Sequence, residues 1–391
     1  MLRFRGEPLN APTRLRDGTH RAASLATTWR RFAPKAARAG ITRIAELTGL
    51  DTLGIPVFAA IRPLGKSLST QQGKGLTREA ARISALMESL ETWTAEELAL
   101  PRVRGSHRAL AKRRRVIDVS DLPRPRQRID LDARRDWVEG WDLIADAAVL
   151  VPAEAVTLDT TFTKPPAFDI SSNGLASGNA LVEAIAHGLC EVIERDAEAA
   201  WRRGGGERRL VLDTVGDPAC RALIDRIVGS GARVVVWDLA SRAELCALGC
   251  AIVEDPREPL WRALGCYQGF GAHLVPEVAL ARALTEAAQT RLTYIAGGRD
   301  DFFPDDYARA TDPELLAEMW ARLPDGEPVA FDELPRYVTR GLGEDVEILV
   351  ELARRAGARE VVAVDLTHPE LGVPVAKVLV PGFATDVEAL G

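Results

Sequence analysis

The sequence predicts an α+β protein, with sheets flanked by helices and one glycine-turn-helix unit repeated around a common centre. Three observations lead to this prediction. Strand-like apolar runs alternate with helical patterns along the chain. Two glutamate pairs, Glu88/Glu91 and Glu191/Glu194, each have the i, i+3 spacing of one helix face. Each pair follows a glycine-rich stretch by about a dozen residues.

Length and composition are those of a soluble protein with several lobes. We expect one domain over residues 1–391, with sub-lobes at approximately 1–100, 101–170 and 171–391. The chain is 47% hydrophobic and 27% charged, with a net charge of −6. Its five cysteines form no CxxC pair, which favours a reducing cytoplasm. No apolar run is long enough to span a bilayer.

Spacing and capping residues predict the first elements. Trp29 and Phe32 belong to a helical apolar pattern, although Pro34 weakens its second half. Residues 55–61 predict a strand. Thr77 is a good N-cap for the helix that carries the first glutamate pair. A strand, a Gly-Lys-Gly turn and a helix therefore follow one another.

An arginine-rich connector containing proline follows at residues 101–135. Such charge suits an acidic peptide or nucleic acid, but the stretch has no interleaved aromatic residues for base stacking. We therefore favour a solvated connector. The arginine-rich start of the chain resembles a transit peptide in composition, an interpretation we disfavour because residues 40–43 already fit folded protein.

The remaining chain predicts further strands around a second glycine turn and helix, followed by a short α/β unit. These elements are expected as strands at 137–143, 148–151, 232–239, 245–254 and 263–267, a turn and helix at 172–203, and a helix at 220–229.

A third copy of the helical pattern occupies residues 269–291. The frame Leu-x-Glu-x-x-Glu/Gln recurs with Glu88, Glu191 and Glu286 at the same position. Chance similarity between alanine-rich helices accounts for the leucines and alanines. It accounts poorly for three glycine-turn entrances that each lead to such a glutamate, so we predict one unit used three times.

The glutamate pairs indicate a metal site. Two such helices brought together aim four carboxylates at one place, which is too much negative charge to bury unpaired. Mg2+ is usually held by a few carboxylates and a substrate phosphate. We therefore predict a nucleotide–magnesium site whose metal-binding residues are Glu88, Glu91, Glu191 and Glu194.

Neighbouring residues fit a nucleotide. A glycine turn that leads into a helix offers backbone N–H groups to phosphate, and the turn at residues 73–75 adds a lysine. P-loop, Rossmann and protein-kinase motifs are absent, so an ATP site here is of another kind. Asn179 and Glu183 share a helical spacing with the second pair, and Arg195 or Arg282 suits phosphate. No HExxH pair or Ser–His–Asp arrangement stands out.

At these residues the chain resembles YcaO proteins over nearly its whole length. The string N-x3-E-x7-E-x2-E-R, from Asn179 to Arg195, is highly specific. The other matching segments are residues 40–43, the Gly-Lys-Gly turn with the first glutamate pair, GFGAHLVPEVALARALTEAAQTR and DLTHPELGVPVAKVLVPG.

The resemblance implies a YcaO-type fold around a central ATP site, with Mg2+ held by glutamates of two helices. By motif position, the four glutamates of the two pairs resemble the metal-binding carboxylates. Arg195 and Arg282 resemble catalytic residues. The residues that resemble nucleotide contacts are Ser177, Asn179, Glu183, Arg195 and Arg282, with Lys74 and, most loosely, Arg21 and Thr28. Many relatives have arginine where this chain has Thr92.

The resemblance also implies ATP-dependent activation of peptide backbone amides, in which no covalent enzyme nucleophile is required. A sulfide nucleophile gives a thioamide, whereas a Cys, Ser or Thr side chain of the substrate gives an azoline. Residues 380–391 lack the PxPxP tail of azoline-forming relatives. We therefore expect thioamide formation on a ribosomal precursor peptide or protein, beside a TfuA-like partner.

Three alternatives remain: an azoline-forming cyclodehydratase, a non-catalytic peptide-docking subunit, and an ATP-using activator of unrelated sulfur transfer. Retention of all four glutamates disfavours the docking subunit. We expect a cytoplasmic homodimer that binds neither nucleic acid nor membrane.

Overall fold

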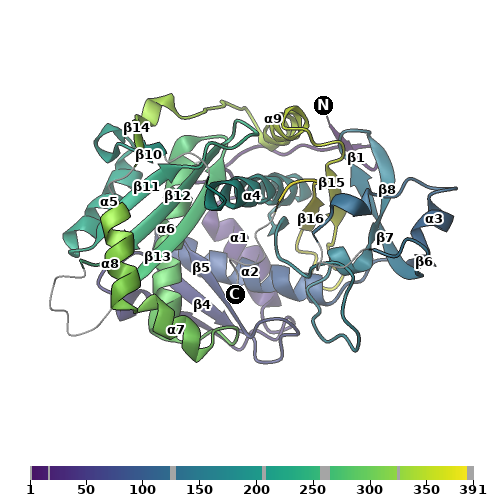
Figure 1. Ribbon diagram of the computed structural model, residues 1–391. Coiled ribbons are helices and arrows are strands. Elements are labelled where there is room, and N and C mark those ends of the chain that lie inside the picture. Colours follow the sequence, from purple (N-terminus) through teal and green to yellow (C-terminus); the bar gives the residue numbers. More distant parts are fainter. Residues whose placement is uncertain are drawn as a thin grey trace.

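The computed structural model describes residues 2–15, 18–123, 129–204, 208–255, 265–323 and 326–384. In this part of the chain the strands form four sheets around three long helices (Figure 1). Helix α4 (Leu181–Arg202) runs through the middle, with a five-stranded sheet on the left of the view and a six-stranded sheet on the right. The predicted α+β class, with sheets flanked by helices, is confirmed.

The two larger sheets flank α4. The five-stranded sheet has the order β13-β12-β11-β10-β14 and is antiparallel except for the β10–β14 pair. Its strands are β10 (Arg208–Leu210), β11 (Arg233–Asp238), β12 (Cys246–Val253), β13 (Cys266–His273) and β14 (Glu327–Val329). The six-stranded sheet has the order β6-β7-β15-β16-β9, with β8 paired to β7. Its strands are β6 (Val103–Gly105), β7 (Arg135–Asp142), β8 (Ala147–Pro152), β9 (Leu175–Ser177), β15 (Val362–Asp365) and β16 (Val375–Leu379).

The two smaller sheets lie in the first part of the chain. Strands β1 (Arg3–Phe4) and β2 (Glu7–Pro8) pair with each other, and β3 (Arg43–Glu46), β4 (Val57–Ile61) and β5 (Thr70–Lys74) form an antiparallel sheet. The other helices are α1 (Leu25–Phe32), α2 (Arg78–Glu96), α3 (His107–Leu110), α5 (Pro218–Gly229), α6 (Pro276–Ala296), α7 (Pro304–Ala310), α8 (Pro313–Arg322) and α9 (Leu342–Arg355).

Most predicted elements are present, with changed boundaries. Thr77 caps α2, because its hydroxyl accepts a hydrogen bond from the Ala80 N–H at 3.1 Å. The second predicted turn and helix begins with a strand, β9, and becomes helical only at Leu181. Residues 263 and 264 of a predicted strand, and residues 205 and 206 just after the predicted helix at 172–203, lie outside the described residues. Strands β1 to β3, β6, β10 and β14 to β16 and helices α3 and α7 to α9 were not predicted.

The glycines of the repeated unit do not form the turn that the sequence suggested. Gly73 and Lys74 belong to strand β5, and Gly269 and Gly271 belong to β13. A Cβ on Gly73 would lie 1.9 Å from the Ala85 nitrogen of α2. These glycines therefore allow a strand to lie directly on the backbone of the following helix.

The same close approach recurs in the other two copies. A Cβ on Gly269 would lie 2.1 Å from the Ala287 nitrogen of α6. In the middle copy the glycine is on the helix, where a Cβ on Gly188 of α4 would lie 2.6 Å from the Gly174 carbonyl oxygen. The repeat is thus a strand packed tightly on a helix: β5 on α2, β9 on α4 and β13 on α6.

Several arginines of the connector form ion pairs with nearby acidic residues. Arg104, Arg114 and Arg115 form ion pairs with acidic residues of β7, and Arg108 pairs with Asp132. Residues 124–128 of the connector lie outside the described part. No helix among the described residues is both long and apolar enough to cross a membrane.

Candidate functional site

Three helices bring five carboxylates into one region. Helix α2 contributes Glu88 and Glu91, α4 contributes Glu191 and Glu194, and α6 contributes Glu286. Glu91 interacts electrostatically with Glu88 and Glu191, while Glu194 interacts with Glu191 and Glu286. The structure therefore brings together the four glutamates that the sequence singled out, and it adds a fifth.

Burial raises the pKa of each of the four predicted glutamates. Burial raises the pKa of Glu88 to about 7, although Lys74 and Arg299 oppose the change. Burial also raises the pKa of Glu194 to about 7 and that of Glu91 well above its ordinary value. Glu191 is shifted in the same direction, again chiefly by burial. A cation among these side chains would favour their ionised forms.

The residues fit Mg2+ in their chemistry. Carboxylate oxygens are the hard donors that Mg2+ prefers, and buried carboxylates need a counter-charge. Among the described residues, no group of three or more His, Cys, Asp or Glu side chains is arranged to hold one ion. Mg2+ commonly takes one or two carboxylates and completes its shell with water and phosphate oxygens. The donor set therefore suits a metal shared with a nucleotide.

A chain of hydrogen bonds links the predicted nucleotide contacts near the N-terminus of α4. The buried Glu183 carboxylate accepts from the Arg21 guanidinium at 3.3 Å, the Ala22 N–H at 2.8 Å and the Asn179 amide at 3.4 Å. The Thr28 hydroxyl donates to the Asn179 side-chain oxygen at 3.0 Å. The N-terminal pair, Arg21 and Thr28, is thus connected to the motif residues of α4.

The two predicted catalytic arginines face the carboxylates from different helices. Arg195 of α4 pairs with Glu198 at 2.7 Å, and Glu286 is the strongest of the acids that raise the Arg195 pKa against the effect of burial. Arg282 of α6 contacts the His187 ring nitrogen. Burial lowers the pKa of His187 well below its usual value, with the Arg282 charge as a further cause.

Ser177 and Lys74 also lie at the carboxylate cluster. Ser177, at the end of β9, donates its hydroxyl to the Met87 carbonyl at 3.5 Å, and its interaction with Glu91 lowers the pKa of that carboxyl against the larger effect of burial. The Lys74 ammonium, at the end of β5, lies 2.7 Å from a carboxylate oxygen of Glu286. Every site residue that the sequence named therefore lies in or beside one region, formed by α2, α4, α6 and the segment around Arg21.

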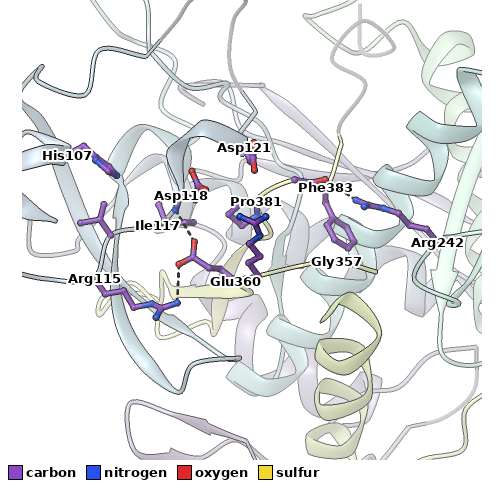
Figure 2. A pocket seen from close by; sticks show the side chains of 13 residues that line it. His107, Arg115, Ile117, Asp118, Asp121, Arg242, Gly357, Glu360, Pro381 and Phe383 are labelled. Carbon is purple, nitrogen blue, oxygen red and sulfur yellow. Dashed lines mark hydrogen bonds and ion pairs between the residues drawn. The ribbon is translucent and has the colours of Figure 1, made fainter. Parts of the chain in front are cut away.

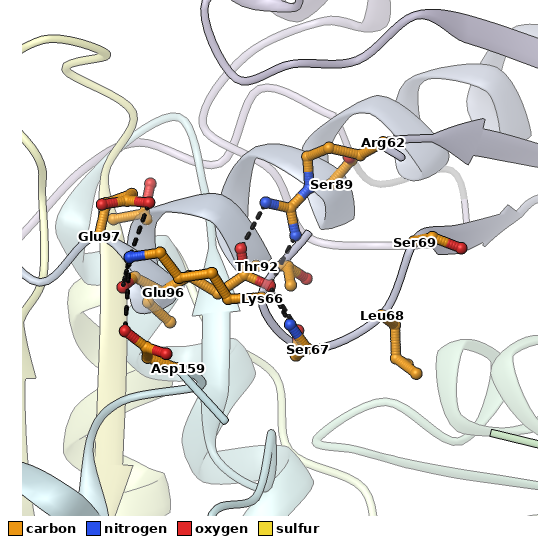
Figure 3. A network of polar contacts seen from close by, with 12 residues as sticks. Arg62, Lys66, Ser67, Leu68, Ser69, Ser89, Thr92, Glu96, Glu97 and Asp159 are labelled. Carbon is orange, nitrogen blue, oxygen red and sulfur yellow. Dashed lines mark hydrogen bonds and ion pairs between the residues drawn. The ribbon is translucent and has the colours of Figure 1, made fainter. Parts of the chain in front are cut away.

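A second polar network anchors the C-terminal half of α2 (Figure 3). The buried Arg62 guanidinium binds both carboxylate oxygens of Glu96, at 2.5 and 2.8 Å, and the Ser67 N–H donates to the same carboxylate. Lys66 pairs with Asp159 at 3.4 Å. Thr92, where the resemblance led us to expect arginine, donates its hydroxyl to the Glu88 carbonyl at 2.9 Å within the helix.

Sequence reasoning missed three charged residues of the site. Glu286 was recognised in the repeat but not as a site residue. Arg299 follows α6 and interacts with Glu88. Lys377 of β16 is 3% exposed, and burial lowers its pKa to about 8 although Glu191 raises it. Only Glu286 had a signal in the sequence, because its frame matches the other two copies.

Two cavities differ in their relation to this region. A small one, of about 30 Å3, is lined by Arg21, Glu183, His187 and Arg282. A larger one, of about 630 Å3, lies elsewhere, between the connector and the segment at residues 381–383 (Figure 2). Its charged lining is mixed in sign: Arg115, Arg242 and Arg359 with Asp118, Asp121 and Glu360. No residue of the larger cavity was singled out from the sequence as a site residue.

Comparison with known families and proteins identifies relatives that match most of this chain. Residues 72–384 match the model of a family described as YcaO cyclodehydratase, ATP- and Mg2+-binding. A protein of Rhizobium leguminosarum bv. trifolii, named as lying in the tfuA 3′ region, is 35% identical over 383 residues, covering 95% of this chain and 90% of that protein. An uncharacterised protein of Methanothermobacter thermautotrophicus is also 35% identical, covering 93% and 96%.

Two solved structures have similar folds. YcaO from Methanopyrus kandleri, bound with AMPPCP and Mg2+, has a TM-score of 0.77 and 28% identity, covering 96% of this chain and 95% of that one. A heterocyclase in complex with substrate and cofactor also has a TM-score of 0.77, at 23% identity. The match covers 96% of this chain but 54% of the heterocyclase, so that likeness concerns the fold alone.

Proposed function

This chain belongs to the YcaO family, whose members bind ATP and Mg2+, and from that premise we propose that it converts peptide backbone amides into thioamides. The observation that most supports the use of ATP and Mg2+ is the cluster of four glutamates, Glu88, Glu91, Glu191 and Glu194, next to the hydrogen-bonded chain from Arg21 to Asn179. The relative from a tfuA region supports the choice of thioamide over azoline.

The reaction proposed is an exchange of oxygen for sulfur at the amide carbon. A sulfide donor adds to the carbonyl carbon, and the resulting oxyanion takes the γ-phosphoryl group of ATP. Loss of phosphate breaks the carbon–oxygen bond, and loss of a proton from sulfur leaves the carbon–sulfur double bond. Amides need this help because their oxygen is a poor leaving group until it is phosphorylated.

The protein's own residues position the reactants and balance charge. Glu183 and Asn179 would hold the nucleotide, with Arg21 and Thr28 fixed by their hydrogen bonds to them. Arg195 and Arg282 would neutralise the charge that develops during phosphoryl transfer. The four glutamates would hold Mg2+, which supplies electrostatic stabilisation of the phosphate oxygens when it is bound.

A binding experiment tests the site. We expect calorimetry to show Mg2+-dependent binding of a non-hydrolysable ATP analogue to the wild type, and loss of that binding in Glu191→Gln and after chelation of the metal. Glu79→Gln is the matched control, because Glu79 is an exposed residue in the first turn of α2. Affinity in Glu191→Gln equal to that of the control would refute the site.

A second candidate is azoline formation, which the cyclodehydratase description of the matching family favours. Mass spectrometry of a precursor peptide separates the two reactions. Thioamide formation adds the mass difference between sulfur and oxygen, whereas cyclodehydration removes one water. The assay needs ATP, Mg2+, a sulfide source and a TfuA-like partner, because we propose that such a partner works beside this enzyme. We also propose that the protein is a homodimer, which size-exclusion chromatography at micromolar concentration would test, and that it lies in the cytoplasm.

A further inference from the structure

A buried histidine–aspartate pair, His20 and Asp345, joins the first turn of α9 to the residue before Arg21. The ring nitrogen Nδ1 of His20 lies 3.0 Å from one carboxylate oxygen of Asp345. His20 is 8% and Asp345 is 2% exposed, and the other carboxylate oxygen accepts from the Thr339 hydroxyl. Breaking such a bond is costly, because a buried polar group is then left without its partner. The pair therefore fixes where residue 20 lies.

Arg21 is also held from the side of α4. Its backbone N–H donates to the Leu15 carbonyl at 3.0 Å. The next N–H along the chain, that of Ala22, donates to the Glu183 carboxylate at 2.8 Å. Glu183 is itself a predicted nucleotide contact, so its hydrogen bonds can rearrange when a nucleotide binds. The pair on α9 involves no predicted nucleotide contact, and it can persist through that rearrangement.

A small cavity connects the histidine–aspartate pair with the predicted nucleotide contacts. Both residues of the pair line the cavity of about 30 Å3 whose wall also includes Arg21 and Glu183. The His20 ring packs edge-on against the ring of His273 at the end of β13, with the ring centroids 4.8 Å apart. Helix α9 packs on α4, which carries Glu183 (Figure 1). A displacement of the pair would therefore change the surroundings of Arg21 directly.

We propose that His20 and Asp345 are positioning residues, which hold Arg21 at the place from which its guanidinium contacts a nucleotide. The Arg21 guanidinium lies 3.3 Å from the Glu183 carboxylate, and its side chain is 30% exposed. An arginine whose backbone is already fixed needs less ordering when a ligand binds, and this saving appears as affinity. The proposal rests on the proposed function, because it requires a nucleotide beside Arg21.

Substitutions of the pair test the proposal through their dependence on Arg21. In His20→Ala we expect calorimetry to show about three- to tenfold weaker binding of a non-hydrolysable Mg2+–ATP analogue, because Arg21 is no longer held in place. Asp345→Ala should weaken binding equally, and the double variant of the pair no further. In an Arg21→Ala background, His20→Ala should leave the affinity unchanged. His20→Asn should restore most of the affinity, because the asparagine amide places an N–H group near the position of the histidine Nδ1.

Glu351→Gln is the matched control on α9, because Glu351 is exposed and pairs with Arg354 of the same helix. Thermal unfolding of the ligand-free variants identifies any that fail to fold, and binding is measured well below the midpoint temperature of every variant. If His20→Ala fails to fold, His20→Phe takes its place in the cycle. This variant keeps a ring against His273 and removes the hydrogen bond to α9.

Four results would overturn the proposal. Unchanged affinity in His20→Ala or His20→Phe would mean that the pair serves the fold alone. An equal loss with and without Arg21 would mean that the pair acts on binding by another route. Failure of His20→Asn to recover affinity would exclude the hydrogen bond as the cause. Unchanged affinity in Arg21→Ala would show that Arg21 is no nucleotide contact, and would leave the proposed function intact. Absence of analogue binding by the wild type would instead refute the proposed function.

Discussion

The buried glutamates should destabilise the ligand-free protein at neutral and alkaline pH, and Glu194→Gln should reveal this. Glu194 is 1% exposed, and burial raises its pKa from an ordinary 4.5 to about 7. The folded chain therefore holds this proton more tightly than the unfolded chain does. The penalty is absent below the unfolded pKa, grows as the pH rises towards 7 and is constant above it.

The size of the effect follows from the shift. Moving a pKa from 4.5 to about 7 corresponds to an upper limit of about 3.5 kcal/mol, at about 1.4 kcal/mol per pH unit. Glutamine keeps an oxygen for the Ala272 N–H, which lies 2.7 Å from the carboxylate, so packing is largely retained. We expect Glu194→Gln to raise the free energy of unfolding by about 1–3 kcal/mol at alkaline pH.

Calorimetric or spectroscopic unfolding of the ligand-free protein, at about pH 8 and about pH 5.5, measures this difference. The midpoint temperature of Glu194→Gln should exceed that of the wild type by a few degrees at the higher pH, and by less at the lower. Glu79→Gln should shift neither. Glu194→Gln should also lose Mg2+-dependent nucleotide binding. A midpoint difference between Glu194→Gln and the wild type that is the same at both pH values would refute the reasoning.

Two further predictions concern packing. Gly73→Ala should lower the free energy of unfolding by about 2 kcal/mol or more, because the new Cβ would overlap the backbone of α2. Gly49 has open space around it, so Gly49→Ala should change the free energy of unfolding little. Urea titration of both variants measures the difference. Arg62→Met should destabilise the chain by about 3–5 kcal/mol, because it leaves the Glu96 carboxylate buried and unpaired. Arg62→Met/Glu96→Gln should recover much of that loss, and a double variant no more stable than the single one would show that the pair matters for some other reason.

The sequence was most informative where chemistry and helical period coincide. The i, i+3 glutamate pairs of α2 and α4 predicted both a helix face and a charge cluster, and the structure brings them together. The glycines were harder to interpret. Gly73 and Gly269 resemble turn residues when only local conformation is considered, yet they lie in strands. These strand positions need glycine because a side chain there would clash with the backbone of the following helix. That requirement is tertiary, so a local pattern does not express it.

The cations of the site were the least predictable part, for a related reason. Lys377 comes from β16 and Arg299 from the segment after α6, and neither has a spacing that relates it to the glutamates. Their proximity depends on how β16 packs on α4 and how α6 meets β5. In the third copy, Gln289 replaces the second glutamate and donates to the Gln72 carbonyl at 3.1 Å. That helix thus uses one frame position to dock on the sheet, and this leaves Glu286 as its single acid facing the cations of the other two copies.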